Sequence, residues 1–309
     1  MRYLIENERF KVVVTGSSSK LMSKEYATVL TGRHIDIEIF PLSFREFLRF
    51  KGEKIEDVAD VYRSRIKIRR LLDEFLEWGS FPEIVLLDTK VKKLELLRQY
   101  FDDILIKDIR GRFKIKDEKF LTSLAHIYLA NISNIVRFRK LSREFNKSVS
   151  TVERYSYYFE IARLFYFLNK ISYKVKEVEK SLKKVYVADL AFHNKLALKF
   201  SKNFGRIVEN AVFLELIKKY KPNKELFYYV TKSGKEIDFT IKQGDRVIKL
   251  IEVCAERDFE EHGKKLAEAG KELKCKDLLC ITWDYEGEEY LKKERVIFLS
   301  LWKWLLFSF

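Results

Sequence analysis

The spacing of apolar residues changes along this chain, and that change restricts the fold more than any other feature. From about residue 53 to residue 173, apolar side chains recur three and four positions apart, which is typical of helices that bury one face. The helices expected there span 66–78, 91–109 and 119–129. From about residue 203, short apolar runs bounded by polar turns replace this spacing and predict strands. These strands are expected at 226–231, 236–241, 247–255, 277–283 and 296–299, with helices at 205–220 and 259–273.

The opening segment has a strand–helix–strand order. Residues 10–16 form a β-branched run that predicts a buried strand, and residues 34–39 alternate as a second strand would. Ser17 and its neighbours offer N-caps for a helix between the two strands, and a further helix is expected at 44–50. Two strands are too few for a doubly wound sheet. The chain is therefore expected to begin in the middle of an α/β domain.

A helix-turn-helix order is expected within residues 132–173. A short helix at 141–145 and a second helix from Ser150 to Phe159 flank a turn, and strands follow. The strands are expected at 171–178 and 184–187, and the whole order predicts a winged helix. Side chains suited to contact phosphates and base edges surround the turn. They are Lys140, Arg143, Lys147, Ser150 and Arg154. The alternative is that the winged helix only packs between neighbouring domains.

The chain has a large surplus of positive charge. Its formal net charge is +15, which attracts polyanions such as nucleic acid, nucleotides or anionic lipid. The alternative is a lysine-rich surface of the kind found in thermophilic proteins, which the scarcity of glutamine also fits. Both interpretations stay open at the level of sequence.

The cysteines and the apolar runs point to a cytoplasmic protein. The three cysteines are Cys254, Cys275 and Cys280, and their odd number and apolar surroundings predict reduced, buried thiols rather than disulfides or a zinc site. No run of about 18 apolar residues is free of charges, so no membrane span is expected. The charged N-terminus does not have the pattern of a signal peptide.

No phosphate-binding loop is present in this sequence. Such a loop needs Gly-x-x-x-x-Gly-Lys-Ser/Thr, because bare backbone N–H groups must surround the phosphates. The Gly-Lys pairs begin at Gly234, Gly263 and Gly270, and none of them is followed by Ser or Thr. No apolar strand ends in Asp-Glu to hold Mg²⁺ either. The chain is therefore expected not to hydrolyse ATP by itself.

Three acidic positions are candidates for metal chemistry. Glu209 lies on an expected helix, Asp238 on a strand and Glu252 on the next strand, fourteen positions later. This arrangement resembles the Asp…Glu-x-Lys pattern of restriction-like nucleases, in which the acidic groups hold Mg²⁺ and the lysine positions the attacking water. Cys254 stands at the lysine position and supplies no fixed positive charge. The candidate substitutes are Lys235, Lys264 and Lys265. The alternative is a degenerate fold that retains acidic residues without activity.

Several short motifs together resemble the archaeal and bacterial AAA-type ATPases that carry a C-terminal domain of unknown function with a restriction-endonuclease-like core. Residues 14–18 resemble the end of the strand that follows the Walker B strand in that family, and residues 79–83 resemble its Gly-Gly-Phe-Pro-Glu motif. The other matching segments are 30–33, 39–47, 100–104, 107–109, 205–210 and 299–306. The resemblance covers essentially the whole chain, but the nucleotide-binding half of the family is absent. The chain is expected to be either a truncated remnant or the product of a misplaced gene start.

The resemblance implies a mixed α and α/β architecture. It would comprise part of a P-loop ATPase α/β core at 1–52, a helical lid or linker at 53–130, a winged helix at 131–200 and a restriction-endonuclease-like α/β domain at 201–309. It also implies ATP and Mg²⁺ as cofactors. The residues expected to sense the nucleotide are Thr15, Ser17, Ser18 and Arg33. For these serines helix capping is the alternative role, and for Arg33 a surface position is the alternative.

The function expected from these observations is that of an ATPase-family protein without ATP hydrolysis of its own. It would act by binding nucleic acid, a protein partner or further copies of itself. The two alternatives are a Mg²⁺-dependent nuclease, with catalytic and metal-binding roles for the acidic residues, and a DNA-binding winged-helix module.

Overall fold

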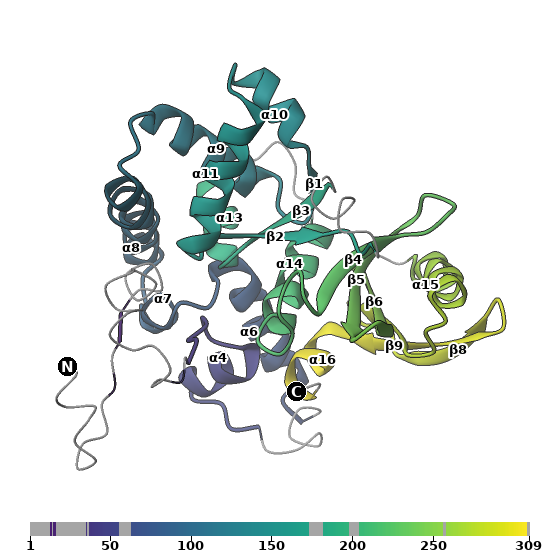
Figure 1. The fold of residues 1–309 in the computed structure, drawn as a ribbon. Helices are drawn as coiled ribbons and strands as arrows, with labels where there is room; N and C mark the ends of the chain where they lie inside the picture. Colours follow the sequence, from purple (N-terminus) through teal and green to yellow (C-terminus); the bar gives the residue numbers. More distant parts are fainter. Residues whose placement is uncertain are drawn as a thin grey trace, which may run out of the picture.

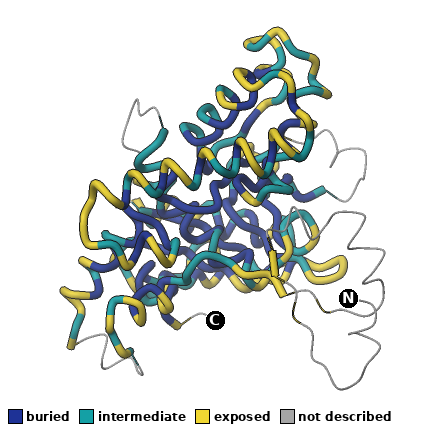
Figure 2. The backbone as a smooth tube through the Cα atoms, turned by 90° about the vertical axis from the view of Figure 1, so that its left-hand side faces the viewer, coloured by how far each residue is buried: buried dark blue, intermediate teal, exposed yellow. Residues whose placement is uncertain are grey.

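The computed structural model has a mixed α/β fold with two sheets (Figure 1). It describes residues 13, 15, 16, 35, 37–55, 63–172, 182–197, 204–255 and 258–307. Figure 1 shows a three-stranded sheet among the helices and a larger sheet beside it. In the tube view the buried segments form a continuous centre, and exposed segments lie at the periphery (Figure 2).

Helices make up the first part of the described chain. They are α4 (Phe44–Phe50), α6 (Arg65–Trp78), α7 (Pro82–Leu86), α8 (Lys90–Asp103), the π-helical segment η1 (Ile104–Gly111) and α9 (Glu118–Ala130). Helix α4 begins with a capping box, in which Glu46 N donates to Ser43 Oγ at 3.2 Å and Ser43 N donates to Glu46 Oε2 at 2.7 Å. The helices expected at 44–50, 66–78 and 119–129 are confirmed. The helix expected at 91–109 is divided into α8 and η1.

A small antiparallel sheet lies in the middle of the chain. Its strands are β1 (Ile135–Val136), β2 (Phe165–Asn169) and β3 (Lys183–Val187), in the order β1-β3-β2. Helices α10 (Phe138–Glu144) and α11 (Val149–Ile161) stand between β1 and β2, and α13 (Leu190–Leu196) follows β3.

The predicted cap of α11 is wrong, and one predicted strand lies mostly outside the described residues. The cap of α11 is Ser148 rather than Ser150, because the Ser148 hydroxyl accepts from Thr151 N at 3.1 Å. Of the strand expected at 171–178, only residues 171 and 172 are described, and they are not in a strand; residues 173–178 lie outside the described residues. Strand β2, at 165–169, was not expected, and every residue in it is buried. Full burial produces a continuous apolar run there, which by itself does not mark where a strand ends.

A mixed six-stranded sheet forms the C-terminal part. Its strands are β4 (Leu226–Val230), β5 (Glu236–Gln243), β6 (Arg246–Cys254), β7 (Leu278–Thr282), β8 (Gly287–Leu291) and β9 (Glu294–Ser300), in the order β4-β5-β6-β7-β9-β8. Helix α14 (Phe204–Leu216) precedes it, α15 (Phe259–Leu273) connects β6 to the parallel strand β7, and α16 (Leu301–Phe307) ends it. The predicted strands and the helix expected at 205–220 are present with shifted ends, and α15 has the predicted bounds. Strand β8 was missed, because this edge strand has few apolar residues.

The two sheets are joined through strands β2 and β4, which lie side by side. Ile171 N donates to Tyr228 O at 2.8 Å, next to a parallel bridge between Lys170 and Tyr228. Strand β3 also packs against α14, where the rings of Tyr186 and Phe213 stack at 3.9 Å between centroids. The junction is therefore a packed interior, not a flexible connection.

Only residues 13, 15, 16, 35 and 37–52 of the α/β core expected at 1–52 are described. Val13 is 89% exposed and Ile37 is 80% exposed, and neither belongs to a strand. The strands expected at 10–16 and 34–39 are thus not observed for their described residues. A strand needs a hydrogen-bonded neighbour, and among the described residues no strand pairs with either segment. Only α4 is observed as a regular element within 37–52.

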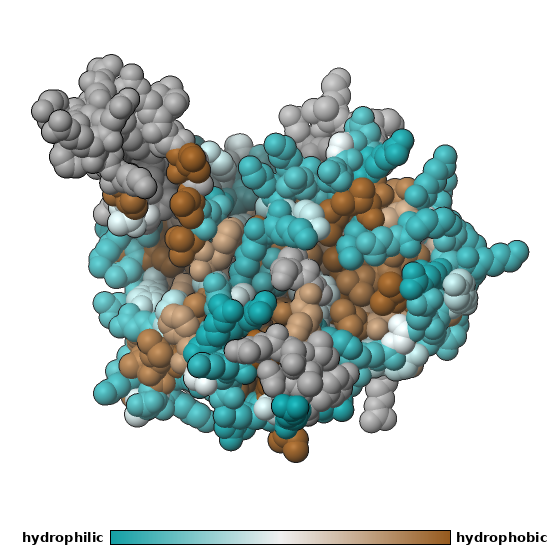
Figure 3. Space-filling view, turned by 90° about the horizontal axis from the view of Figure 1, so that it is seen from below, coloured by the Kyte–Doolittle hydropathy of each residue, from teal (hydrophilic) through white to brown (hydrophobic). Residues whose placement is uncertain are grey.

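On the side shown in Figure 3, hydrophobic patches lie between hydrophilic regions. Within the described part of the chain, no helix is both long and apolar enough to cross a bilayer. All three cysteines are buried and free, as predicted.

A buried charge cluster and an exposed helix pair

The candidate carboxylates come together where strands β5 and β6 separate. Backbone pairing of these strands extends as far as Phe239 and Ile251. Immediately beyond it, side chains replace the backbone partners: Val253 N donates to Asp238 Oδ2 at 2.9 Å, and Asp238 N donates to Glu252 Oε2 at 3.2 Å. The fork between the strands therefore holds Asp238 and Glu252 in fixed positions.

A lysine that the sequence did not single out completes this cluster. Lys184 projects from β3, and its side chain is 1% exposed. Its Nζ lies 2.6 Å from Glu209 Oε1, 2.7 Å from Glu236 Oε1 and 3.0 Å from Asp238 Oδ1. An ammonium group has three N–H donors, and each of them therefore has a carboxylate acceptor.

Strand β3 also supplies a second partner to Glu209. Tyr186 lies two residues after Lys184, so both side chains point to the same face of the strand. The Tyr186 hydroxyl donates to Glu209 Oε1 at 2.7 Å. This alternation is visible in the sequence, but the sequence does not indicate which helix faces the strand.

Helix α15 contributes two cations on the other side of Glu252. His262 Nδ1 lies 2.9 Å from Glu252 Oε1, and Lys265 forms an ion pair with the same oxygen. The two residues are three positions apart, which places them on one face of the helix. Of the three lysines considered as substitutes, Lys265 thus reaches the acidic residues. Lys264 instead pairs with Glu260 at 2.6 Å and Lys235 with Glu268 at 4.0 Å.

The pKa values of the two carboxylates nearest Lys184 move in opposite directions. Burial and the charge of Asp238 raise the pKa of Glu209 to about 8, although Lys184 and Tyr186 act against this rise. Burial also acts to raise the pKa of Asp238, but Lys184, Lys265 and the bond from Val253 outweigh it and hold that pKa below its usual value. Asp238 therefore carries the negative charge, and Glu209 takes up a proton more readily.

Glu252 and its partners are similarly coupled. Burial and the neighbouring Asp238 raise the pKa of Glu252, against the effects of His262 and Lys265. Burial acts to lower the pKa of His262, but bonds to Cys254 and Glu252 raise it to about 10. His262 is consequently a cation at neutral pH. The cluster is a set of carboxylates neutralised by protein cations.

Mg²⁺ does not fit this arrangement. Among the described residues, no group of three or more His, Cys, Asp or Glu side chains is arranged to hold a metal ion. The carboxylate oxygens of Glu209, Glu236 and Asp238 instead surround the Lys184 ammonium group. A divalent cation at the same place would meet a positive charge at contact distance, which is strongly unfavourable in a buried site.

The candidate DNA-binding residues lie in a different environment. Helix α11 exposes a stripe at helical spacing, and the preceding helix α10 exposes several basic residues. We call this the α10–α11 surface. It consists of Arg137, Arg139, Lys140, Arg143, Ser150, Glu153, Arg154 and Tyr157. Figure 1 places α10 at the upper end of the molecule, away from the six-stranded sheet.

The predicted DNA-binding residues are not equally available to contact DNA, because some of them already have partners within the protein. Lys147 pairs with Asp117 at 2.7 Å, and Lys140 lies 3.6 Å from Glu144. Ser150 shares a hydrogen bond of 2.9 Å with the capping residue Ser148. Arg143 and Arg154 are exposed, and neither forms an ion pair with another residue in the described ranges.

The residues expected to sense the nucleotide lie mostly outside the described part of the chain. Thr15 is exposed, whereas Ser17, Ser18 and Arg33 lie outside the described residues.

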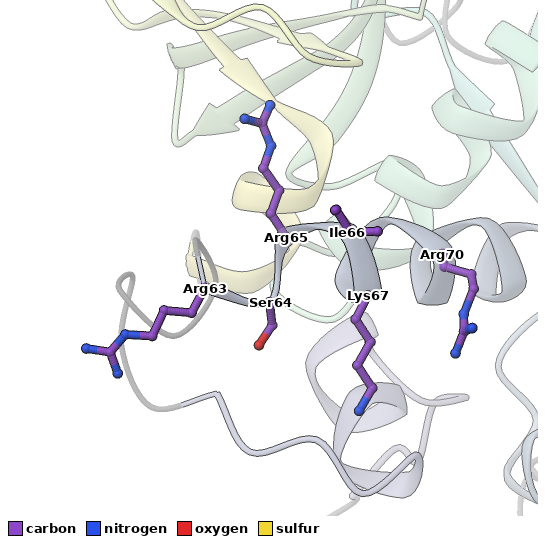
Figure 4. A pocket seen from close by; sticks show the side chains of 6 residues that line it. All are labelled: Arg63, Ser64, Arg65, Ile66, Lys67 and Arg70. Carbon is purple, nitrogen blue, oxygen red and sulfur yellow. The ribbon is translucent and has the colours of Figure 1, made fainter.

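A hollow of about 570 Å³ lies at the start of α6 and has mostly basic lining residues (Figure 4). They are Arg63, Ser64, Arg65, Ile66, Lys67 and Arg70. Figure 4 shows that the basic side chains point in different directions and do not converge on one point.

In comparisons with known proteins, three family models match successive parts of the chain. An AAA domain matches residues 1–48, a domain of unknown function (DUF8612) matches residues 69–203, and another (DUF4143) matches residues 204–304. No solved structure matches the chain.

Two relatives match almost the whole chain. An uncharacterized protein of Haemophilus influenzae is 29% identical over 94% of this chain and 70% of its own length. An uncharacterized protein of Methanocaldococcus jannaschii, MJ1544, is 36% identical over 98% of this chain and 70% of its own length. The chain therefore belongs to an AAA-like, ATPase-related protein family, of which the M. jannaschii protein is also a member.

Proposed function

We propose that this AAA-like protein binds duplex DNA through the α10–α11 surface and does not hydrolyse ATP by itself. The observation that carries the proposal is the exposed stripe on α11. Ser150, Glu153, Arg154 and Tyr157 follow one another at helical spacing, and Tyr157 is 57% exposed. An exposed, uncovered stripe on the second helix of a helix–turn–helix is what contact with a DNA groove requires.

The order of the elements supports this interpretation. Helix α9, strand β1, helices α10 and α11, and strands β2 and β3 follow one another, and the sheet order is β1-β3-β2. In a winged helix the two helices after the first strand form the helix-turn-helix, and the hairpin of the last two strands forms the wing. Its second helix enters the major groove, while the first crosses the backbone.

Charge supports the proposal in the same region. Arg139, Lys140 and Arg143 on α10 are exposed, and Arg154 is exposed on α11. Guanidinium groups bind phosphates and the edges of guanine through paired hydrogen bonds. The formal net charge of +15 adds a long-range attraction for any polyanion.

Charge reversal on this surface tests the proposal. Arg143→Glu combined with Arg154→Glu should weaken binding to a 20-base-pair duplex by at least about tenfold, because each contact contributes about 1–3 kcal/mol. Fluorescence anisotropy with labelled DNA measures this effect. Two substitutions at exposed basic residues away from the surface, Arg246→Glu and Lys232→Glu, are the matched control with the same change in net charge.

The results separate the possible outcomes. Loss of affinity in the surface variant alone supports the α10–α11 surface. Equal loss in both variants would mean that only net charge matters, and unchanged affinity in the surface variant would reject the proposal.

Metal-dependent DNA cleavage is the second candidate. The convergence of Glu209, Asp238 and Glu252 favours it, and so does the order α14-β4-β5-β6-α15-β7, which resembles that of restriction-like nucleases. The position of Lys184 counts against it. Incubation of supercoiled plasmid with the protein and Mg²⁺ or Mn²⁺ tests this candidate, with Asp238→Asn as the control. Cleavage that this substitution abolishes would establish a nuclease; we expect none. ATP and Mg²⁺ remain cofactors implied by the AAA-like relationship.

A further inference from the structure

We propose that Lys184 is a built-in cation of the carboxylate cluster, which occupies the position of a divalent metal and keeps metal out while β3 is docked against the six-stranded sheet. The proposal does not depend on DNA binding by the α10–α11 surface. It concerns what fills the acidic cluster and which part of the chain supplies it.

The coordination of Lys184 is the first argument. Its Nζ lies 2.6–3.0 Å from oxygens of Glu209, Glu236 and Asp238, which come from α14 and β5. Oxygen ligands surround Ca²⁺ at about 2.3–2.6 Å, so the ammonium group fills a shell only slightly wider than that of a metal. All three of its donors are used, and no donor is directed to solvent.

The origin of Lys184 is the second argument. Lys184 belongs to the region matched by DUF8612, at 69–203, whereas all three carboxylates belong to the region matched by DUF4143, at 204–304. The cation and its ligands are thus contributed by different parts of the chain. Separation of these parts would leave the carboxylates without Lys184.

The attachment of β3 is the third argument. Asn210 is completely buried on α14 and binds the β3 backbone twice: Val187 N donates to Asn210 Oδ1 at 2.9 Å, and Asn210 Nδ2 donates to Val187 O at 3.0 Å. The stacked rings of Tyr186 and Phe213 lie beside these bonds. Strand β3, and with it Lys184, is therefore held in a fixed position.

Titration with Mn²⁺ tests the proposal. The electron paramagnetic resonance signal of free Mn²⁺ decreases as the protein binds the ion, and this decrease measures binding. Wild-type protein and Asp238→Asn should bind Mn²⁺ equally weakly, because the cluster is closed. Lys184→Gln should gain one Mn²⁺ site, and the affinity of that site should be at least tenfold higher than the Mn²⁺ affinity of the wild-type protein. The double variant Lys184→Gln/Asp238→Asn should lose that site. Lys249→Gln, which removes a lysine paired with Asp277 at 3.2 Å, controls for the change in net charge.

Each outcome decides for or against the proposal. Wild-type binding that Asp238→Asn abolishes would overturn it, as would a folded Lys184→Gln protein that gains no Mn²⁺ site. If Lys184→Gln does not fold, its cooperative melting should return in Mn²⁺ and not in equimolar Na⁺; absence of that recovery would count against the proposal. DNA affinity is measured on the same samples. Because it reports on the α10–α11 surface alone, failure of the Lys184 proposal and failure of the DNA-binding proposal give different results.

Discussion

Lys184 and Arg143 both lie in the region between α9 and α13, yet they have opposite surroundings. Lys184 is buried among three carboxylates, whereas Arg143 is exposed and forms no ion pair with another described residue. A charge of the first kind has exchanged water for fixed protein partners, so it holds parts of the chain together. A charge of the second kind still has its hydrogen bonds available to a ligand. A positively charged side chain therefore has two different uses in one molecule.

Removal of the buried cation should have the largest effect. Lys184→Met leaves Glu209, Glu236 and Asp238 close together without a counter-charge. Breaking a buried ion pair in this way typically costs about 3–5 kcal/mol, which urea unfolding measures. Lys264→Met, at an exposed pair with Glu260, is the control and should change stability little. Equal stability of the two variants would show that burial does not distinguish these charges.

A second buried carboxylate, which forms no ion pair within the described ranges, sharpens the comparison. Asp189 is fully buried and accepts from Ser80 N at 2.7 Å and from Ala191 N at 2.9 Å. Gly79 adjoins it with φ of +72°, and a Cβ there would overlap the carboxylate. Gly79→Ala should therefore cost about 3 kcal/mol, from overlap and from backbone strain.

The control for that substitution is Gly52→Ala. Gly52 has a similar φ of +81°, but a Cβ there would meet nothing within 4 Å. Thermal unfolding should show a smaller loss for Gly52→Ala, of about 1 kcal/mol, since strain alone remains. Similar losses at both glycines would mean that contact with Asp189 is unimportant.

The pH dependence of Asp189 follows from its burial. Burial raises its pKa from 3.8 to about 6, although bonds from Ser80 and Ala191 act against the rise. The folded state therefore binds the proton more tightly than the unfolded state does. Stability should fall as the pH rises from about 4 to about 6 and then become independent of this group. Asp189→Asn should remove that part of the dependence in unfolding curves recorded at several pH values.

The charge of His262 should persist far above neutral pH. Its folded-state pKa of about 10 lies above the ordinary 6.5, because the bonds to Cys254 and Glu252 outweigh burial. Its contribution to stability is therefore complete below about pH 6.5 and is lost as the pH rises through about 10. NMR titration of the histidine ring should show this high midpoint. Glu252→Gln should move the midpoint toward 6.5, and an unchanged midpoint would contradict the assigned cause.

Charge reversal on the exposed surface should have the smallest effect on stability. Arg143→Glu removes no ion pair with a described residue, so its free energy of unfolding should stay within about 0.5 kcal/mol of wild type. Urea unfolding of this variant and of Lys184→Met under identical conditions measures the contrast directly. A large loss at Arg143 would indicate that the α10–α11 surface is part of the folded interior.

Local sequence patterns predicted much of the fold but not the partners across it. Helix α15 and the strands of Asp238 and Glu252 were predictable, because apolar spacing marks each element separately. Lys184 was not, since alternation assigns it to a face of β3 without showing that Glu209 lies opposite. The choice of Ser148 over Ser150 as the cap of α11 also depends on local backbone geometry that two similar serines do not reveal.

The central claim, that the exposed charges bind DNA and the buried ones do not, is tested most directly by the salt dependence of DNA affinity. Each phosphate contact releases counterions and adds about one to the slope of log affinity against log salt concentration. The account predicts a steep slope for the wild-type protein, which is reduced by about 2 in Arg143→Glu/Arg154→Glu and unchanged in Arg246→Glu/Lys232→Glu. An unchanged slope in the first variant, or binding that salt does not weaken, would contradict it.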